Sequence, residues 1–177
     1  MSILTSIRYR WFEHQRKKQP PRTAAFPVAG SWHSVLLLYE SDIREKNTSV
    51  NEIIRRLMDE DRDVTAWGFL DVKNPHSAVL PQSRVMGLHD LNLLHDLKKP
   101  VREELQQKHY DLLIDLTEHP CLPLHYAAMY ADAAFKTGRH IINGVHDLMV
   151  DMPAADNPVP LYEQILHFLT TIRSNDK

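Results

Sequence analysis

The chain has 177 residues, of which 43% are apolar and 25% are charged, as in one ordinary globular domain. Eleven prolines against five glycines exclude a collagen-like or low-complexity chain, and a single cysteine excludes a disulfide scaffold and a four-cysteine zinc site. The net charge of −2 provides no general attraction to nucleic acid, and the longest apolar run is far too short to span a membrane. We therefore expect no metal, no nucleic-acid partner and no membrane span.

Charge is unevenly distributed along the chain. Residues 1–22 contain six cations and one anion, a net charge of +5, so the remaining 155 residues carry −7. The basic segment lacks the apolar core and the small-residue cleavage site of a secretory signal peptide. We therefore expect a cytoplasmic protein.

Residues 1–20 predict a basic amphipathic helix. Ile3, Ile7 and Trp11 recur every four residues, with Leu4 beside them, and so share one face of a helix. The two prolines that follow end this helix, because proline lacks an amide hydrogen and restricts the residue before it.

Three interpretations of this helix are open. It packs on its own domain or on a partner protein, which includes a second copy of the chain. Alternatively, it lies on a membrane surface, where two aromatic side chains with flanking cations fit well, or it is a nucleic-acid arm, which nothing else in the chain supports. We favour the first. The residues expected to contact a partner or a membrane are Ile3, Leu4, Ile7, Arg8, Trp11 and Phe12.

The segments after residue 30 alternate between strand and helix patterns. Residues 35–39 and 111–116 are continuous apolar runs, typical of strands buried on both faces. The alternation predicts one three-layer, Rossmann-like α/β domain over residues 31–177, with a mostly parallel sheet of five or six strands. Strands are expected at residues 35–39, 64–72, 84–88, 111–116, 135–142 and 146–152, and helices at 50–58, 100–108, 123–135 and 160–172.

Some parts of this assignment are weak. Whether the segments near Arg84 and Phe135 join the sheet is left open by the sequence. Gly138 is expected to end the alanine-rich helix, and residues 73–83, which are rich in turn formers, predict a flexible loop.

Ligands of parallel sheets bind beyond the carboxyl ends of the strands, where the strand order reverses. Glu40, Ser41 and Asp42 follow the first predicted strand, at the turn where a nucleotide-binding sheet normally has glycines. Two carboxylates there repel a phosphate, so we expect no nucleotide cofactor, although a neutral ligand such as a sugar is compatible with the turn. Glu40 and Asp42 are either a general acid–base pair or caps of the turn.

The densest chemical cluster follows the strand at 111–116. Cys121 near a helix N-terminus, with His125 four residues on, permits a nucleophilic pair or, together with His119, a metal site. We favour a packing or capping role, because no third orienting residue is identifiable. The candidate ligand-binding residues of this cluster are Thr117, Glu118, His119, Cys121 and His125.

The run from Tyr110 to Leu116, the alanine-rich helix and the segment from Phe135 to Gly138 resemble the first, acceptor-side Rossmann domain of bacterial heptosyltransferase-like glycosyltransferases. In that family a second Rossmann domain binds the sugar nucleotide, and the turn after the first strand contains a glycine that is missing here. The layout of the whole chain is similar to a small uncharacterised bacterial family of single-domain proteins. This resemblance implies the fold and a non-catalytic default.

These observations lead to one function hypothesis and two alternatives. The first is a non-catalytic Rossmann-like module that associates with a partner protein or with itself through the N-terminal helix. The second is a glycosyltransferase-like enzyme, or a sugar- or phospho-sugar-binding half-domain that needs a partner. It predicts a deep pocket near Glu40, Ser41, Glu118 and His119. The third is a peripheral membrane protein.

Overall fold

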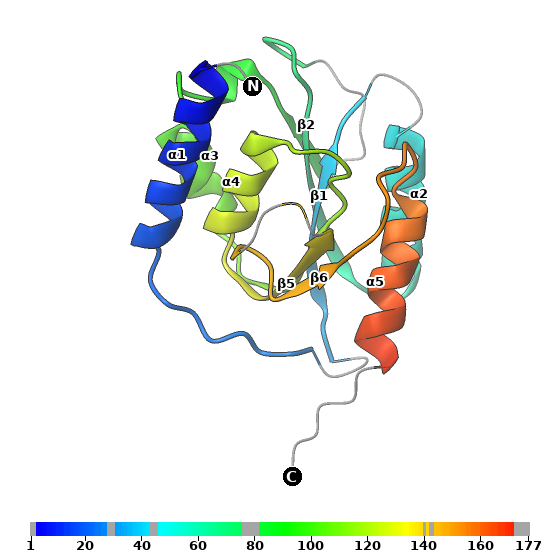
Figure 1. Ribbon diagram of the computed structural model, residues 1–177. Helices are drawn as coiled ribbons and strands as arrows, with labels where there is room; N and C mark the ends of the chain where they lie inside the picture. Colours follow the sequence, from blue (N-terminus) through cyan, green and yellow to red (C-terminus); the bar gives the residue numbers. More distant parts are fainter. Residues whose placement is uncertain are drawn as a thin grey trace.

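One parallel sheet forms the centre of the protein. The computed structural model describes residues 3–27, 31–42, 46–75, 82–139, 141 and 144–171. The strands within these residues are β1 (Ser34–Glu40), β2 (Asp63–Phe69), β3 (Ser83–Met86), β4 (Tyr110–Asp115), β5 (Ala133–Arg139) and β6 (Leu148–Val150). They lie in the order β3-β2-β1-β4-β5-β6, and all neighbours are parallel (Figure 1). The predicted sheet of five or six mostly parallel strands is confirmed.

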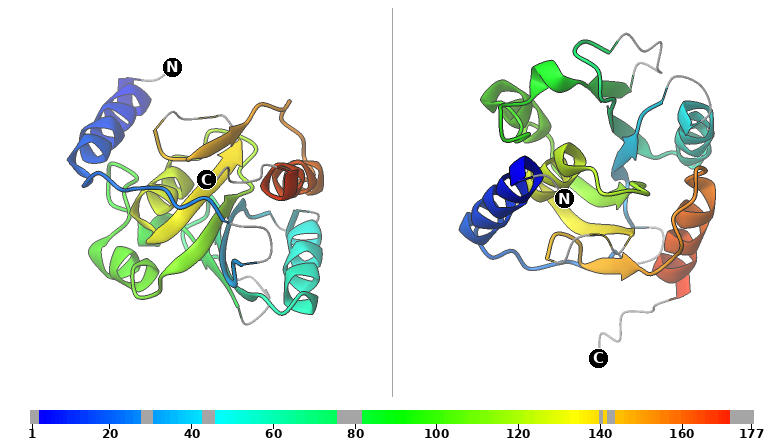
Figure 2. Two further views of the ribbon diagram at one scale, coloured as in Figure 1. Left: turned by 90° about the horizontal axis from the view of Figure 1, so that it is seen from below. Right: turned by 45° about the horizontal axis from the view of Figure 1, so that its top comes forward.

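Helices cover both faces of this sheet. The α-helices within the described residues are α1 (Ile3–Lys18), α2 (Lys46–Asp59), α3 (Lys99–Leu105), α4 (Leu122–Tyr130) and α5 (Val159–Thr171), and a short 3-10 helix, η1 (Leu88–Asp90), precedes α3. α1, α3 and α4 lie on one side and α2 and α5 on the other, as the two views of Figure 2 show. Two clusters of buried apolar side chains fill the spaces between the layers. The predicted three-layer, Rossmann-like α/β fold is therefore confirmed.

The central strand shows why a continuous apolar run forms a buried strand here. Leu36 and Leu38 belong to the apolar cluster on the α4 side, whereas Leu37 and Tyr39 belong to the cluster on the α2 side. This alternation follows from the two-residue period of a strand. Because β1 is paired on both edges and covered on both faces, every one of these positions needs an apolar side chain.

Both weak strand segments join the sheet. Arg84 lies in β3, which pairs with β2, and Phe135 lies in β5, which pairs with β4 opposite Leu112. These pairings place two further strands beside the strongly predicted ones, and they bring the strand count to the upper value expected from the sequence.

The helix predicted at 123–135 is wrong at its C-terminal end. α4 ends at Tyr130, and Ala131 leaves the helical conformation with a ψ of 135°. Gly138, expected to end the helix, lies inside β5 instead, where an added Cβ would be 2.8 Å from the Cβ of Asp115. A glycine at this position therefore permits close approach between β5 and the end of β4.

The other elements differ from the predictions mainly at their ends. β2 ends at Phe69 rather than at residue 72, and α3 ends at Leu105 because Gln106 already caps it. β6 is shorter than predicted at both ends. Of the predicted loop at 73–83, residues 76–81 lie outside the described residues, as do residues 142 and 172, which end two other predicted elements.

The N-terminal helix is packed on the domain through Phe12. This side chain has no exposed surface, and its ring meets that of Tyr126 edge-on at 5.0 Å and that of His125 at 6.4 Å. The indole Nε1 of Trp11 donates to Asp96 Oδ2 at 3.4 Å. Phe12 therefore belongs to the face of α1 that packs on the domain, although the sequence analysis expected it to contact a partner or a membrane.

The opposite side of α1 exposes apolar side chains. Ile3, Leu4 and Ile7 are 82%, 55% and 46% exposed. Of the face predicted from the four-residue spacing, Trp11 therefore packs on the domain, whereas Ile3, Leu4 and Ile7 remain largely exposed.

Candidate functional site

The strand order reverses beside β1. From β1 the chain moves outward through β2 and β3, and then returns to the other side of β1 as β4. Glu40 and Asp115 end these two strands and so flank the reversal point. Open α/β sheets bind their ligands beyond the strand ends at such a point.

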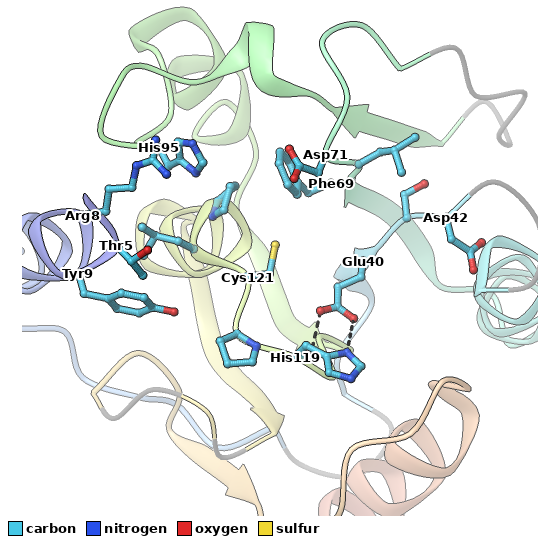
Figure 3. A pocket seen from close by; sticks show the side chains of 15 residues that line it. Thr5, Arg8, Tyr9, Glu40, Asp42, Phe69, Asp71, His95, His119 and Cys121 are labelled. Carbon is cyan, nitrogen blue, oxygen red and sulfur yellow. Dashed lines mark hydrogen bonds and ion pairs between the residues drawn. The ribbon is translucent and has the colours of Figure 1, made fainter. Parts of the chain in front are cut away.

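A pocket of about 500 Å³ lies at this edge of the sheet (Figure 3). Its walls come from the turns after β1 and β2, from the segment between β4 and α4, from α1, and from His95. Five of the candidate ligand-binding residues line it: Glu40, Ser41, Asp42, His119 and Cys121. The other lining residues are Thr5, Arg8, Tyr9, Phe69, Leu70, Asp71, His95, Pro120, Leu122 and Pro123.

Glu40 and His119 form a polar pair on the wall of this pocket. Glu40 Oε1 accepts a hydrogen bond from the backbone N–H of His119 at 3.1 Å, and Oε2 lies 3.3 Å from the ring Nδ1 (Figure 3). The glutamate side chain is 18% exposed and the histidine 53%. The pair ties the segment after β4 to the end of β1, and it presents a carboxylate and an imidazole to a ligand.

The turn after β1 is built without glycine, as the sequence indicates. Ser41 donates its N–H to the carbonyl of Phe69 at 2.8 Å and its hydroxyl to Asn47 Oδ1 at 3.1 Å. Asn47 Nδ2 donates to the carbonyl of Asp42 at 2.6 Å. The side chain of Asn47, in the first turn of α2, therefore links Ser41 and Asp42 to that helix.

Cys121 and His125 are both neutral in this fold. Burial raises the pKa of the Cys121 thiol to about 12, and burial lowers the pKa of His125 to about 4. A thiolate–imidazolium nucleophile is not supported by this arrangement. In the described part of the chain, no group of three His, Cys, Asp or Glu side chains is placed to hold a metal ion.

Three candidate residues do not line the pocket. Thr117 donates its backbone N–H at 3.0 Å, and also its hydroxyl, to Asp115 Oδ1. Glu118 is 3% exposed, accepts from the N–H of Ala155 at 3.2 Å, and has a pKa raised by burial. His125 is 1% exposed inside the core. All three are buried, so their contacts lie within the fold.

Sequence reasoning missed the residues that come from outside the strand ends. Arg8, expected to face a partner, lines the pocket together with Thr5 and Tyr9, because α1 folds back over the sheet edge. His95 comes from the loop before α3, and no local pattern pointed to it. Asp71 follows the second strand, at one of the strand ends where a ligand is expected, but it was not among the candidate residues; β2 ends at Phe69, before the predicted end at residue 72.

The family of the chain follows from its sequence as a whole. A family model described as a family of unknown function, DUF6913, matches residues 6–172. The chain belongs to the DUF6913 family. The expected membership of an uncharacterised family is thereby confirmed. No curated protein sequence matches this DUF6913 chain.

Among solved structures, the DUF6913 chain is similar to E. coli heptosyltransferase WaaC with ADP. The two share 14% sequence identity with a TM-score of 0.46, over 81% of this chain and 49% of that chain. The DUF6913 chain thus spans about half the length of that structure.

No helix in the part of the chain that the structure describes is both long and apolar enough to cross a membrane.

Behind the pocket, the DUF6913 domain holds a buried ion pair. Asp115 Oδ2 lies 3.0 Å from His146 Nε2, and the two side chains are 2% and 1% exposed. Burial alone raises the pKa of Asp115, but the hydrogen bond and charge of His146, with smaller contributions from His125 and Thr117, hold it below the ordinary value. This carboxylate therefore anchors the end of β4, next to the pocket.

The buried His125 predicts a loss of stability in mild acid. Its pKa is about 4 in the folded state against an ordinary 6.5, so the unfolded chain binds the proton more readily. We expect the free energy of unfolding to fall by about 3 kcal/mol as the pH drops from 6.5 to 4. Urea unfolding of wild type and His125→Leu at a series of pH values measures this. Equal pH slopes for the two proteins would contradict it.

Proposed function

We propose that this domain binds a small polyhydroxylated ligand, of the sugar class, in the pocket at the reversal point of its sheet. The observation that carries the proposal is the pocket itself, which lies where open α/β sheets bind ligands. Its volume of about 500 Å³ falls within the range of about 300–1,000 Å³ that small-molecule sites occupy.

The chemistry of the strand-end wall supports a ligand that donates hydrogen bonds. Glu40, Asp42 and Asp71 line this wall, and an ionised carboxylate only accepts hydrogen bonds. The vicinal hydroxyls of a sugar provide the matching donors. Tyr9 and Phe69 add aromatic surface for the apolar face of a sugar ring.

α1 completes the site as its outer wall. Thr5, Arg8 and Tyr9 reach the pocket from this helix, which Phe12 fixes on the domain. The site therefore forms only where the N-terminal helix is docked. The basic N-terminal helix therefore forms one wall of a pocket whose opposite wall, at the strand ends, is acidic.

A ligand screen tests the proposal. A panel of pentoses, hexoses and their monophosphates is added to the purified protein, and the melting temperature is measured. A probe at 100 times its Kd stabilises by about 2.7 kcal/mol, which raises the melting temperature of a domain of this size by roughly 5–10 °C. If no member of the panel raises it, sugar binding is excluded.

For a probe that binds, Asp71→Asn is expected to weaken the affinity roughly 5- to 20-fold, because a charge-assisted hydrogen bond becomes a neutral one. Asp59→Asn, which removes a carboxylate at the exposed end of α2, is the matched control. Titration calorimetry measures both. Equal affinities of the two variants would contradict the assignment of Asp71 to the site.

A second candidate function is association of the chain with a second copy through α1. The observation that favours it is the exposure of Ile3, Leu4 and Ile7 on one side of this helix. Light scattering that finds only monomers at high protein concentration would remove this candidate. Vesicle binding through the same side chains is the membrane alternative. The non-catalytic role and the cytoplasmic location stay predictions.

A further inference from the structure

Arg8 lies on the α1 wall of the pocket, and one nitrogen of its guanidinium is unpartnered. Its Nε is buried and has no hydrogen-bond partner among the residues that the structure describes. Arg16, on the same helix, is by contrast paired with Glu13 at 2.8 Å. Arg8 is the only lysine or arginine among the described residues that line the pocket, so it is the side chain there that can offer a cation to an anionic group of a ligand.

His95 lies beside Arg8 on the same wall (Figure 3). Its backbone has a φ of 59°, in the left-handed region that favours glycine. Burial and, to a smaller extent, the Arg8 cation lower the pKa of the imidazole, against an opposing effect of the Asp71 carboxylate. Arg8 thus provides the positive charge at this end of the pocket, and the neutral His95 ring adds a hydrogen-bonding group beside it.

The relative position of these two residues is fixed by contacts outside the pocket. Asn92 Oδ1 accepts from the N–H groups of Leu94 at 2.8 Å and of Asp96 at 3.2 Å, which shapes the loop around His95. Asp96 Oδ2 in turn accepts from Trp11 Nε1 on α1. This hydrogen bond joins α1 to the loop of His95, since Trp11 lies three residues after Arg8 and Asp96 follows His95. It therefore fixes the position of Arg8 relative to His95.

The pocket is polarised between this wall and the opposite one. Figure 3 shows Asp71 and Glu40 across the pocket from Arg8 and His95. An anionic group near the strand ends would meet like charges, whereas the same group near Arg8 meets a cation and N–H donors. A ligand that carries both hydroxyls and one anionic group therefore has a single favourable orientation.

We propose that Arg8, supported by His95, binds the phosphate of a sugar monophosphate, whose hydroxyls face the carboxylates at the strand ends. This assignment rests on the proposed function and narrows its ligand class. Guanidinium is the side chain best suited to a phosphate, because its planar fork donates two parallel hydrogen bonds. Arg8 is thus a specificity-determining residue of the site.

Titration calorimetry with a hexose, its monophosphate, the corresponding sugar acid and inorganic phosphate tests this. Wild type is expected to bind the monophosphate roughly 10- to 100-fold more tightly than the parent hexose. Arg8→Gln is expected to abolish this difference between the affinities for the monophosphate and for the hexose. Arg10→Gln is the matched control, because Arg10 is an exposed cation of the same helix and does not line the pocket. This variant should keep the preference for the monophosphate. Circular dichroism verifies that both variants fold.

The outcomes separate this inference from the proposed function. If the hexose binds and the phosphate adds nothing, or if Arg8→Gln keeps the preference, the role of Arg8 is wrong and sugar binding stands. A preference for the sugar acid over the monophosphate also overturns the phosphate assignment. If only inorganic phosphate binds, and Arg8→Gln abolishes that binding, the phosphate contact stands and the sugar proposal fails.

Discussion

Replacement of Phe12 by alanine is expected to lower the free energy of unfolding by about 3–5 kcal/mol. Phe12 has no exposed surface, and its ring lies against Tyr126 and His125 of α4. The truncation loses buried apolar area and leaves a cavity between α1 and α4. Ile7→Ala on the same helix, at a side chain that is 46% exposed, is the control and is expected to change stability by no more than about 0.5 kcal/mol. Urea unfolding followed by circular dichroism measures both.

In the folded protein, Phe12→Ala is expected to loosen α1, and with it the pocket, while the central sheet stays intact. Phe12 is the fully buried side chain of α1, so its loss loosens the helix that brings Thr5, Arg8 and Tyr9 to the site. Hydrogen exchange should show faster exchange of α1 amides while β1 and β4 stay protected. The affinity for a binding sugar probe should fall in parallel. Unchanged exchange in α1 would show that other contacts hold the helix, and would contradict this expectation.

The central strands were predictable because their apolar runs have a single interpretation. A segment such as residues 35–39, apolar at every position, fits only an element covered on both faces. From that follows the location of the strand ends, and with it the placement of Glu40, Asp42 and His119 at one edge of the sheet. The rule that ligands bind at the carboxyl ends of parallel strands therefore predicted the strand-end wall of the pocket from the sequence.

The rest of the site depends on contacts that no local pattern encodes. Alanine fits a helix and a covered strand alike, so the end of α4 and the start of β5 could not be separated from composition. The docking of α1 is decided by Phe12 against Tyr126, a contact between residues more than 100 positions apart. The spacing of Ile3 and Ile7 pointed to the wrong side of the helix for that contact. Arg8 and His95 come together only because the contact between Phe12 and Tyr126 docks α1 on the domain.

Asp115→Ala is the second substitution for which we expect a large effect, about 3–5 kcal/mol. The carboxylate is 2% exposed and accepts from Thr117 while pairing with His146 at 3.0 Å. Its removal leaves the buried imidazole and the threonine groups without their acceptor, which costs more than the pair itself contributes. Asp115→Asn, which keeps one acceptor oxygen, is expected to lose less. Urea unfolding of the two variants gives the comparison.

A double-mutant cycle with His146→Ala separates the pair from the anchoring of Thr117. If the ion pair dominates, the double variant should be more stable than the sum of the single losses implies, by at least about 1 kcal/mol. If the losses simply add, the hydrogen bonds to Thr117 are the main contribution of Asp115. The lowered pKa of Asp115 provides an independent readout, because stability that depends on it is lost as the pH falls below its ordinary value of 3.8. That window lies below the one assigned to His125, so an acid titration of wild type should show two successive losses, and the lower one should vanish in Asp115→Asn.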